Sequence, residues 1–494
     1  MQKKSWIYFL IFIAVVACYF LSAWKSTGFY HADEHFQLLE FANYKAGHLS
    51  ADKLPWEFEA QIRPTLQVSI AYLSIKCGNL LGITSPHSIA RSLRFLSLGL
   101  FLVAGIGFLR SYIERGDRRI KTLGFSLCLW FLPFLAVRFS SENWGGIFLI
   151  LGWIFLKGDH KLKWTLSMIF LGLSFWFRFQ MAFAILPLLL AFLLSNRLCK
   201  RDWLQFFGSA LVVLLVGLVV DRWFYGNWVL TPWNYFKVNV LDNKAAEFGL
   251  SPWWQYLKWW WELPQYWVSI PFSIALLLGF FNRKFRLISI VFFSFLLIHS
   301  TVGHKEARFL FPMAILLLPL VHFLMEKIFK ISESIKMGSI WKVAVFAFLV
   351  LNFTWMFLLS FRPVGIGEVT ISEFIETDRS DKPATVIYRS WGNPHNPWEG
   401  KRPTYFYQDE DLHEVKADSP EEIVLAMARA STDQLYYVAR KHHVEESQYV
   451  EFLKEQCLVK VKESLPSWQE QFNAIFPWME WGEVIYLFKL KEGI

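Results

Sequence analysis

The sequence predicts an all-α, polytopic membrane protein with about 11 or 12 transmembrane helices and a C-terminal soluble α+β domain. The 494-residue chain is 54% hydrophobic and only 18% charged, whereas soluble domains carry about 25% charged residues. Its apolar residues gather in runs that approach the roughly 20 residues a helix needs to cross a bilayer. After residue 361 the chain becomes polar and contains no further run.

The first apolar run, residues 6–23, follows the basic start MQKK. It is longer than the apolar stretch of a cleaved signal peptide, which has about 7–15 residues. We therefore expect an uncleaved signal anchor with a cytoplasmic N-terminus. The other candidate spans are 66–84, 91–110, 121–137, 144–157, 163–177, 180–195, 204–221, 266–281, 286–302, 309–326 and 343–361.

Short basic connections orient the spans, because Lys and Arg favour the cytoplasmic side. The basic connections, all expected to be cytoplasmic, are 110–121, 157–163, 196–201, 282–286 and 326–342. Alternation then assigns to the outside the segments 24–65, 138–143, 178–180, 222–265, 303–308 and the C-terminal domain, 362–494. Crossings at both 66–84 and 91–110 would put 110–121 outside. We therefore favour 11 crossings, with a tilted or re-entrant helix at 66–84.

Composition also narrows the function. The net charge of +9 is spread over short loops rather than one basic face, so nucleic acid is not the expected partner. The five cysteines are isolated and form neither a disulfide framework nor a CxxC site. No internal repeat of 20–50 residues is visible, which weakens the interpretation as a transporter.

Two ionisable clusters stand at the edges of apolar spans, namely HADEHFQ (31–37) and HKEARF (304–309). Charge is costly near hydrocarbon, so such clusters are functional candidates. The favoured topology puts both clusters on the outside. Asp33 and Glu34 offer a carboxylate that can take a proton from an attacking hydroxyl.

Cations in the same external loops complete the predicted chemistry. Fixed cations can hold the phosphate of a leaving group, and Arg offers a bidentate fork. The Trp-rich loop at 222–265 suits the headgroup level of a bilayer. Together these parts suit transfer from a lipid phosphate to a hydroxyl acceptor.

At this point the chain resembles the GPI and dolichol-pathway α-mannosyltransferases, glycosyltransferase family 22. HKEARF is the most specific motif of the resemblance, and the series covers residues 25 to about 315. The motifs in chain order are HADEHFQ, WEF with the following IRP, RFSSEN, DRWFYGNWVLTPWNYFKVN, EFG-x-SPWWQY and HKEARF.

The resemblance implies a GT-C transmembrane domain over 1–361, with its site on the lumenal or periplasmic face. It implies a polyprenyl- or dolichyl-phosphate-linked mannose donor, a glycan or glycolipid acceptor, and inversion at the sugar. Asp33 matches the first-loop acid expected to act as base, and Glu34 is its support or substitute. No cofactor is expected, although some GT-C relatives use a divalent cation.

The resemblance also assigns expected substrate contacts. The residues expected at the donor phosphate or the substrate are His304, Lys305, Arg308, Arg63, Arg138, Arg178, His31 and Gln37. Ala32 departs from the family, because the eukaryotic motif usually has Pro there. The signal anchor and basic loops suit a bacterial inner membrane with a periplasmic site; in a eukaryote the ER membrane is expected.

Structural explanations for the same residues stay open. Asp33 and Glu34 would also suit an N-cap and the first turn of a helix. His31 and His35 have metal-ligand spacing, but no third ligand is identifiable. Glu306 could pair with Lys305 or Arg308 in a structural turn.

Single external residues, and the function as a whole, also admit a second explanation. The external arginines could snorkel to headgroups, and Asp221 could satisfy Arg222 or cap the next segment. The alternative functions are a lipid-linked sugar transporter or flippase, and a membrane scaffold whose C-terminal domain binds a partner.

Overall fold

The structure is a computed structural model that describes residues 2–113, 119–334, 338–364, 367–380, 382–397, 403–432, 434–475 and 484–490. The chain divides into two compact units. Unit 1 comprises 1–23, 55–70 and 93–360. Unit 2 comprises 24–54, 71–92 and 361–494, so it combines the first-loop motif with the C-terminal region.

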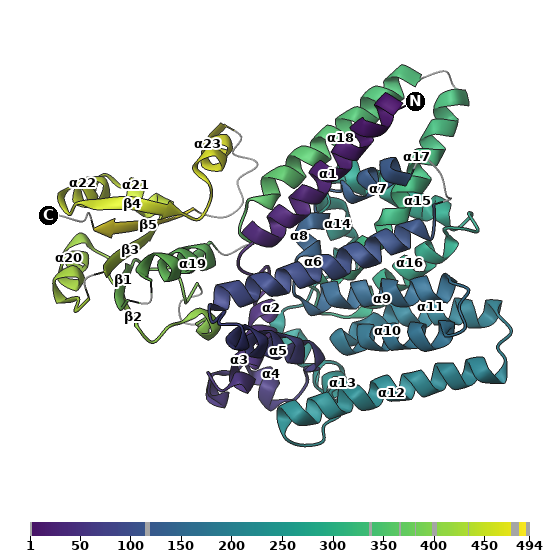
Figure 1. The fold of residues 1–494 in the computed structure, drawn as a ribbon, viewed down its shortest axis with the longest axis horizontal. Helices are drawn as coiled ribbons and strands as arrows, with labels where there is room; N and C mark the ends of the chain where they lie inside the picture. Colours follow the sequence, from purple (N-terminus) through teal and green to yellow (C-terminus); the bar gives the residue numbers. More distant parts are fainter. Residues whose placement is uncertain are drawn as a thin grey trace. The chain divides into compact units, whose positions relative to one another are not determined.

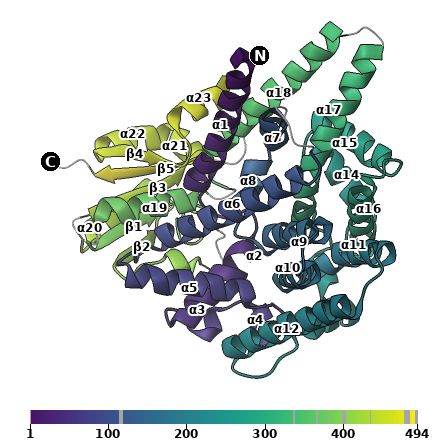
Figure 2. The same cartoon turned by 45° about the vertical axis from the view of Figure 1, so that its right-hand side comes forward.

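Unit 1 is helical. Helix α9 packs along α10, α10 packs along α12, and α11 packs along α16 (Figures 1 and 2). The longer helices are α1 (Gln2–Lys25), α6 (Pro86–Arg110), α9 (Ser141–Lys157), α10 (Lys163–Phe177), α11 (Ala182–Ser195), α12 (Lys200–Tyr225), α15 (Tyr266–Gly279), α16 (Arg286–Thr301), α17 (Leu317–Ser334) and α18 (Gly338–Ser360). The short elements between them are α4 (Trp56–Glu59), α13 (Thr231–Phe236), η4 (Lys237–Leu241), η5 (Lys244–Phe248) and α14 (Gln255–Glu262). Helix α5 (Leu66–Leu80) precedes α6 in the chain.

The predicted single span 121–137 is wrong, because the chain forms two short helices there. Helix α7 (Arg119–Leu127) ends before α8 (Leu132–Ala136), which has Pro133 in its first turn. Proline lacks a backbone N–H and starts helices well, but it interrupts a continuous one. The break is held by Trp130, whose backbone N–H donates to Asn352 Oδ1 at 3.2 Å and whose indole N–H donates to the Pro264 carbonyl at 2.9 Å.

The span predicted from residue 309 also begins differently. Residues Ala307–Leu316 form a 3₁₀ helix, η6, which contains Pro312, and the α-helix α17 follows it. Here Gly146 of α9 lies against the Pro312 backbone, since a Cβ built on Gly146 would be 2.8 Å from the Pro312 Cα and carbonyl oxygen. The glycine therefore permits the close approach of α9 to η6.

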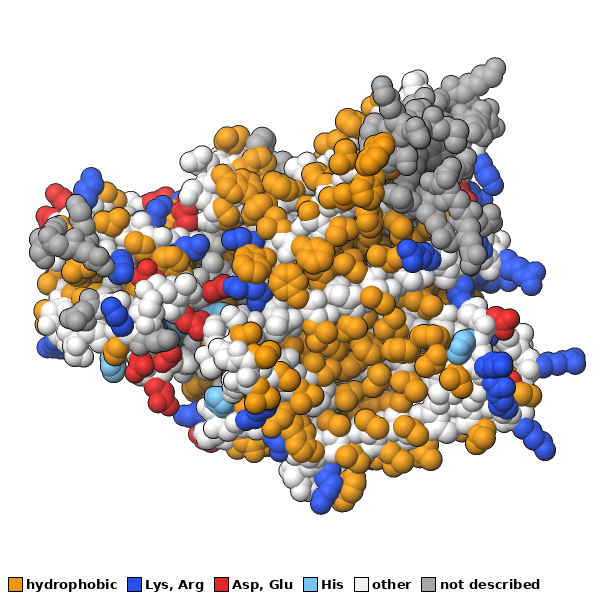
Figure 3. All heavy atoms as spheres, viewed as in Figure 1, with side chains coloured by type: hydrophobic (Ala, Val, Ile, Leu, Met, Phe, Trp, Pro, Cys, Tyr) orange, Lys and Arg blue, Asp and Glu red, His pale blue; other side chains and the backbone are white. Residues whose placement is uncertain are grey.

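The basic connections gather at one end of unit 1. Lys157 Nζ donates to the Ser111 carbonyl at 3.1 Å, and Tyr112 stacks on Phe285 with ring centroids 5.4 Å apart. Arg201 of the 196–201 connection donates to the Lys161 carbonyl, and Gln205 donates to the same oxygen at 2.9 Å, which joins this connection to the one at 157–163. Figure 3 shows Lys and Arg side chains at this end of α9–α12, beyond a broad apolar surface. This is the grouping that the charge pattern predicts for one side of a membrane.

Five helices are long and apolar enough to cross a membrane within the part of the chain that the structure describes, which makes this a multi-pass membrane protein. They lie at Tyr8–Lys25, Pro86–Arg110, Lys200–Tyr225, Ala307–Ile328 and Val343–Ser360. Shorter apolar helices lie at Phe179–Ser195, Tyr266–Gly279 and Arg286–Thr301. The total of 11 crossings stays a prediction.

The arrangement of α1 and α6 fits the favoured side assignment. Arg94 Nε donates to the Ala23 carbonyl at 2.8 Å, and Tyr19 lies against Phe101, so the two helices run antiparallel. Both the start of α1 and the end of α6 thus point to the same side. Helix α5 has only 15 residues, fewer than the roughly 20 that a crossing needs.

Unit 2 contains a five-stranded mixed sheet in the order β2-β1-β3-β5-β4. Strand β1 is parallel to β2 and β3, while β5 is antiparallel to β3 and β4. The strands are β1 (Ala384–Tyr388), β2 (Leu412–Lys416), β3 (Gln434–Arg440), β4 (Leu458–Glu463) and β5 (Ile485–Leu490). This confirms the predicted α+β character of the C-terminal region.

Side chains alternate across the sheet and form two apolar layers, as the period of two along a strand requires. One layer contains Ile387, Tyr437 and Phe488, and the other contains Val386, Tyr436 and Leu487. The helices of this region are α19 (Glu368–Arg379), α20 (Pro420–Arg429), α21 (Lys441–Glu445), α22 (Ser447–Glu455) and α23 (Ser467–Ile475). The first-loop segment of unit 2 forms α2 (Ala32–Glu34), η1 (His35–Leu39), α3 (Glu40–Ala46) and η2 (Ala51–Lys53).

Candidate functional site

A group of charged residues, four of them buried and two partly buried, lies in unit 1 and is here called the basic cluster. It consists of the cations Arg178, Lys305 and Arg308, with His304 and the carboxylates Glu142 and Glu306. Its members come from α9, from the turn after α10 and from the chain before and within η6. The sequence singled out four of these residues, and the structure brings them together.

Glu142 is the centre of the basic cluster. Its Oε1 lies 3.1 Å from Arg178 Nη1 and 3.0 Å from Arg308 Nη1, and all three side chains are buried. Two guanidinium groups thus share one carboxylate in the low-dielectric interior, where each charge needs a partner. Arg178 and Arg308 also lie over the Phe309 ring, at 4.7 and 5.3 Å from its centroid.

The HKEARF motif supplies the second carboxylate of the basic cluster, Glu306. Glu306 pairs with Arg308 and receives a hydrogen bond from the His304 ring at 2.9 Å. This confirms that Glu306 pairs with Arg308, an arrangement that is compatible with a functional role for the same residues. His304 Nδ1 also lies 3.0 Å from the Gly249 carbonyl oxygen, which ties the motif to the EFG segment.

The Lys305 side chain contacts the EFG-x-SPWWQY segment. Its ammonium donates to the Ser251 carbonyl at 3.2 Å and to the Val302 carbonyl, and it lies 5.9 Å from the Tyr256 ring centroid. Because Lys305 is desolvated by burial, its pKa is lowered. A lysine whose charge is poorly solvated gains most from an added anion.

The paired glycines of the segment SENWGG explain how α9 reaches the basic cluster. A Cβ on Gly145 would lie 2.8 Å from Met181 Cγ and 3.3 Å from Arg178 Cβ, while Gly146 faces Pro312. Both neighbours can therefore approach the helix closely. At the start of α9, Ser140 Oγ accepts the Asn143 N–H at 3.3 Å and caps the helix.

Two further predicted arginines lie in unit 1. Arg138 is buried, its carbonyl accepts the Asn143 side-chain N–H at 2.8 Å, and its guanidinium lies 5.6 Å from the Phe134 ring. Arg63 pairs with Glu57 at 3.4 Å and lies 5.9 Å from the Tyr235 ring, whose hydroxyl accepts from Gln180. Tyr235 thereby connects the WEF segment to the RFQ turn.

Asp221 follows neither expected alternative, since its partners are two threonines and the next helix, α13, has no side-chain cap. It is fully buried and accepts hydrogen bonds from the Thr65 N–H at 2.8 Å and the Thr65 hydroxyl at 2.7 Å. It also accepts from the Thr231 hydroxyl at 2.6 Å. Arg222 instead lies over Trp228, with 4.9 Å to the ring centroid. Asp221 therefore connects the segment before α5 to the start of α13 through hydrogen bonds, and it does not pair with Arg222.

The first-loop motif lies in unit 2. His31 is the N-cap of α2, since its Nδ1 accepts the Asp33 N–H at 3.2 Å, and Asp33 and Glu34 occupy the first turn. The expectation that an acid is the N-cap is therefore wrong, because the imidazole nitrogen takes that role. Gln37 is buried on η1.

The two acids of this motif differ in environment. Glu34 is buried and its Oε2 accepts the Tyr30 N–H at 3.3 Å. Asp33 keeps a 20% exposed side chain and lies 3.7 Å from His31 Nδ1. Among the described residues, no three His, Cys, Asp or Glu side chains gather as a metal-ligand group would.

Two residues of the basic cluster region were missed by sequence reasoning, Glu142 and Tyr256. Glu142 stands in the quoted segment RFSSEN, where an acid at the start of an apolar helix was itself a signal. Tyr256 is fully buried beneath Lys305, and only its place in the EFG-x-SPWWQY motif pointed to it.

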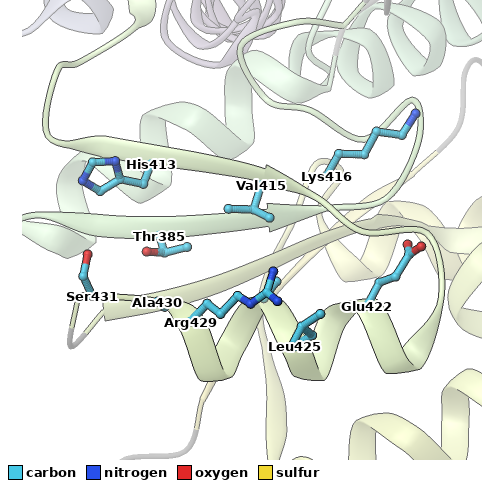
Figure 4. Close-up of a pocket in the computed structure, with 10 residues that line it drawn as sticks. Thr385, His413, Val415, Lys416, Glu422, Leu425, Arg429, Ala430 and Ser431 are labelled. Carbon is cyan, nitrogen blue, oxygen red and sulfur yellow. The ribbon is translucent and has the colours of Figure 1, made fainter.

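An open pocket of about 390 Å³ lies elsewhere in unit 2, between β2 and α20 (Figure 4). His413, Lys416 and Arg429 line it together with Val415 and Leu425. These five side chains are exposed, and the pocket contains none of the residues in the motifs. The basic cluster of unit 1 and the HADEHFQ motif of unit 2 are therefore two candidate groups, each described within its own unit.

A multi-pass membrane protein with a buried basic cluster beside its apolar helices is the class that the fold and the site define. The chain belongs to the Alg9-like mannosyltransferase family, whose sequence profile matches residues 6–387. The membership confirms the resemblance that its motifs indicated.

The similarity to individual relatives is low in identity and covers only part of each chain. The chain is 25% identical to the GPI alpha-1,2-mannosyltransferase 3 of Bos taurus over 290 residues, which is 57% of this chain and 52% of that protein. It is 28% identical over 135 residues to the probable Dol-P-Man:Man(7)GlcNAc(2)-PP-Dol alpha-1,6-mannosyltransferase of Schizosaccharomyces pombe, covering 27% and 24% of the two chains. The chain thus spans about half the length, or less, of these curated relatives. Among solved structures, ArnT from Cupriavidus metallidurans bound to undecaprenyl phosphate aligns over 98% of both chains, with 12% identity and a TM-score of 0.48.

Proposed function

We propose that this protein is an inverting α-mannosyltransferase. It moves a mannosyl residue from a polyprenyl- or dolichyl-phosphate donor to a hydroxyl of a glycan or glycolipid. The observation that carries the proposal is the composition of the basic cluster: the buried Arg178 and Arg308 share Glu142, Arg308 also pairs with Glu306, and Lys305 is a third buried cation bonded only to backbone carbonyls. Family membership supplies the reaction class.

The basic cluster suits the phosphate of a departing lipid. Arg178 and Arg308 can each present two parallel N–H donors to a phosphate, and Lys305 adds a point charge. These cations would stabilise charge that develops on the leaving oxygen, the usual source of large electrostatic effects in catalysis. The name of the Schizosaccharomyces pombe relative contains Dol-P-Man, which supports a lipid-phosphate mannose donor.

Asp33 is the proposed base. The partial exposure of its carboxylate supports this choice over Glu34, which is buried and bonded to the Tyr30 N–H. A base must be reachable by the acceptor hydroxyl whose proton it removes. A single displacement with inversion needs one base, and a phosphate leaving group needs no acid. The proposed reaction also needs no metal ion, because side-chain cations neutralise the phosphate.

The location of the reaction is also a proposal. The motif residues of unit 1 lie away from the basic connections at 110–121, 157–163 and 282–286, which contact one another. Since basic connections favour the cytoplasm, we place the site on the external face. That face is periplasmic in a bacterial inner membrane and lumenal in an ER membrane.

Replacing Asp33 by Asn tests the proposed base. We expect sugar transfer from radiolabelled polyprenyl-phosphate mannose in membranes to fall by about 100-fold or more, the range in which a general base contributes. Asp52→Asn is the matched control, because Asp52 lies in the same loop with an exposed side chain. Near-normal transfer by the Asp33 variant would contradict the proposed role.

A further inference from the structure

A buried polar contact joins the first-loop motif to the C-terminal region within unit 2. His35 Nε2 lies 2.6 Å from Glu40 Oε1, and both side chains are essentially inaccessible to solvent. The same Glu40 oxygen accepts the backbone N–H of Phe406 at 3.0 Å. Phe406 is part of the short 3₁₀ helix η7 (Tyr405–Tyr407), more than 360 residues further along the chain.

A stack of four rings reinforces this contact. Phe29 stacks on His35, His35 on Tyr407, and Tyr407 on His87, with centroid separations of 5.0, 5.4 and 4.6 Å. The three interplanar angles are 24°, 21° and 19°, so the rings are nearly parallel. Tyr407 is therefore held between the imidazole of the first-loop motif and that of His87.

The segment that carries Tyr407 is itself anchored. Thr404 donates to the His395 carbonyl from both its backbone N–H, at 2.7 Å, and its hydroxyl, at 2.9 Å. The His395 ring in turn lies 2.6 Å from Glu414 Oε1, on strand β2. Residues 404–407 thus connect the sheet to His35 through hydrogen bonds and ring contacts.

The need of Glu40 for hydrogen-bond donors stabilises one conformation of the first-loop segment. A buried carboxylate is costly unless it is hydrogen-bonded, so Glu40 favours the chain conformation in which His35 and the Phe406 N–H both reach it. His35 follows Asp33 by two residues. Between them, the Glu34 N–H donates to the His31 carbonyl at 3.0 Å and closes the turn that contains Asp33. Fixing the His35 ring therefore restricts the backbone that carries Asp33.

We propose that residues 404–407 are the positioning element of the base, acting on Asp33 through Glu40, His35 and Tyr407. The inference rests on the proposed function, in which Asp33 accepts the acceptor proton. It gives the C-terminal region a part in transfer itself. Glu40, His35 and Tyr407 are positioning residues, since none of them is proposed to touch substrate.

Two variants remove the positioning contact in different ways. Glu40→Gln weakens the polar part, and Tyr407→Leu removes one ring without leaving a charge unpaired. Tyr407→Phe is the matched control, because it keeps the ring stack. For both test variants we expect kcat to fall by about 10- to 100-fold, the loss that misplacing a catalytic group produces. We expect KM for polyprenyl-phosphate mannose to stay within about twofold, since uniform binding is not removed.

Hydrogen exchange of the full-length protein in detergent supplies a readout that a general loss of stability would not give. We expect faster exchange in the peptide spanning 29–39 for Glu40→Gln and Tyr407→Leu, with unchanged exchange in α9. Tyr407→Phe should resemble the unaltered protein in both measurements. The proposal would be overturned if kcat of Glu40→Gln and Tyr407→Leu were unchanged, or if only their KM rose. It would also be overturned if Tyr407→Phe lost as much kcat as Tyr407→Leu.

The Asp33→Asn variant, assayed in parallel, separates the two hypotheses. If it transfers sugar normally, the proposed base is wrong, whatever the exchange data show. If it is inactive while Glu40→Gln and Tyr407→Leu keep full kcat, the base stands and the positioning role fails. Should Glu40→Gln not fold, the Tyr407 pair alone decides, because leucine and phenylalanine are both apolar and differ in the ring.

Discussion

At the residue scale, Glu142 determines how the arginines of unit 1 are arranged. Its one carboxylate oxygen lies within 3.1 Å of two buried guanidinium groups, one from the turn after α10 and one from η6. A buried ion pair contributes little net stability when formed, but removing one partner leaves an uncompensated charge. Glu142 therefore keeps Arg178 and Arg308 together and in fixed orientation.

Replacing Glu142 by Gln should destabilise the protein clearly. Breaking a buried pair from one side costs about 3–5 kcal/mol, so we expect a lower Tm in detergent and loss of transfer activity. Glu247→Gln is the control, because Glu247 is an exposed acid paired with Lys244 at 2.6 Å and surface pairs contribute about 0–1 kcal/mol. Equal Tm values for the two variants would show that Glu142 is not a structural centre.

At the element scale, the approach of α9 to η6 sets the position of the basic cluster. The 3₁₀ geometry of Ala307–Leu316 and the bare face of Gly146 let the two backbones touch at Pro312. Sequence periodicity predicts that an apolar helix exists, but it says little about which glycine faces which neighbour. The contact between these elements therefore had to come from the structure.

Gly146→Ala tests the close approach. The added Cβ would lie 2.8 Å from Pro312 backbone atoms, which cannot move aside as a flexible side chain would. Overpacking of this kind costs about 1–3 kcal/mol, so we expect a lower Tm and weaker donor binding. Gly99→Ala in α6 is the control, since nothing lies within 4 Å of its Cβ position. Alanine there should leave Tm unchanged or slightly raised, because it favours a helix over glycine; a similar fall in both variants would contradict the explanation.

At the scale of the whole molecule, the chain folds as two units that do not follow its sequence order. Unit 2 joins residues 24–54 and 71–92 to the C-terminal region, and its core includes charged groups. Glu368 at the start of α19 is one of them. Its burial raises the pKa to about 7, and the nearby Arg440 only partly offsets this.

This shift makes stability depend on pH in an unusual direction for an acid. The folded protein binds the Glu368 proton more tightly than the unfolded chain, whose carboxyl titrates near 4.5. The stabilising contribution is therefore present at low pH and is lost as pH rises from about 4.5 to about 7. Glu368→Gln imitates the protonated form, so it should flatten the change of Tm between pH 5 and pH 7.

Thermal unfolding at several pH values checks this expectation. Glu451→Gln, on the exposed side of α22, should keep the pH dependence of the unaltered protein. If the Glu368 and Glu451 variants show the same slope, another group controls the pH response. Near pH 8 the slope of Tm against pH should be similar in all variants, because Glu368 is ionised there in both the folded and the unfolded state.

The sequence by itself determined the polytopic fold, the family and four members of the basic cluster, because hydropathy and local motifs are properties of neighbouring residues. It identified Arg178, His304, Lys305 and Arg308 from their motifs, and it separated the apolar helices from a C-terminal α+β region. Its errors were local. The 121–137 span is interrupted between Leu127 and Leu132, just before Pro133, and His31 rather than an acid caps α2.

Only the tertiary structure decided which distant segments meet. Glu142 between two arginines, Gly146 against Pro312, and Glu40 bonded to Phe406 all join residues far apart in the chain. Such contacts depend on packing and on the need of each buried charge for a partner, and no periodicity in the sequence encodes them. Asp33 and Glu34, adjacent and chemically alike in the sequence, differ in the fold because one is enclosed and the other stays partly open.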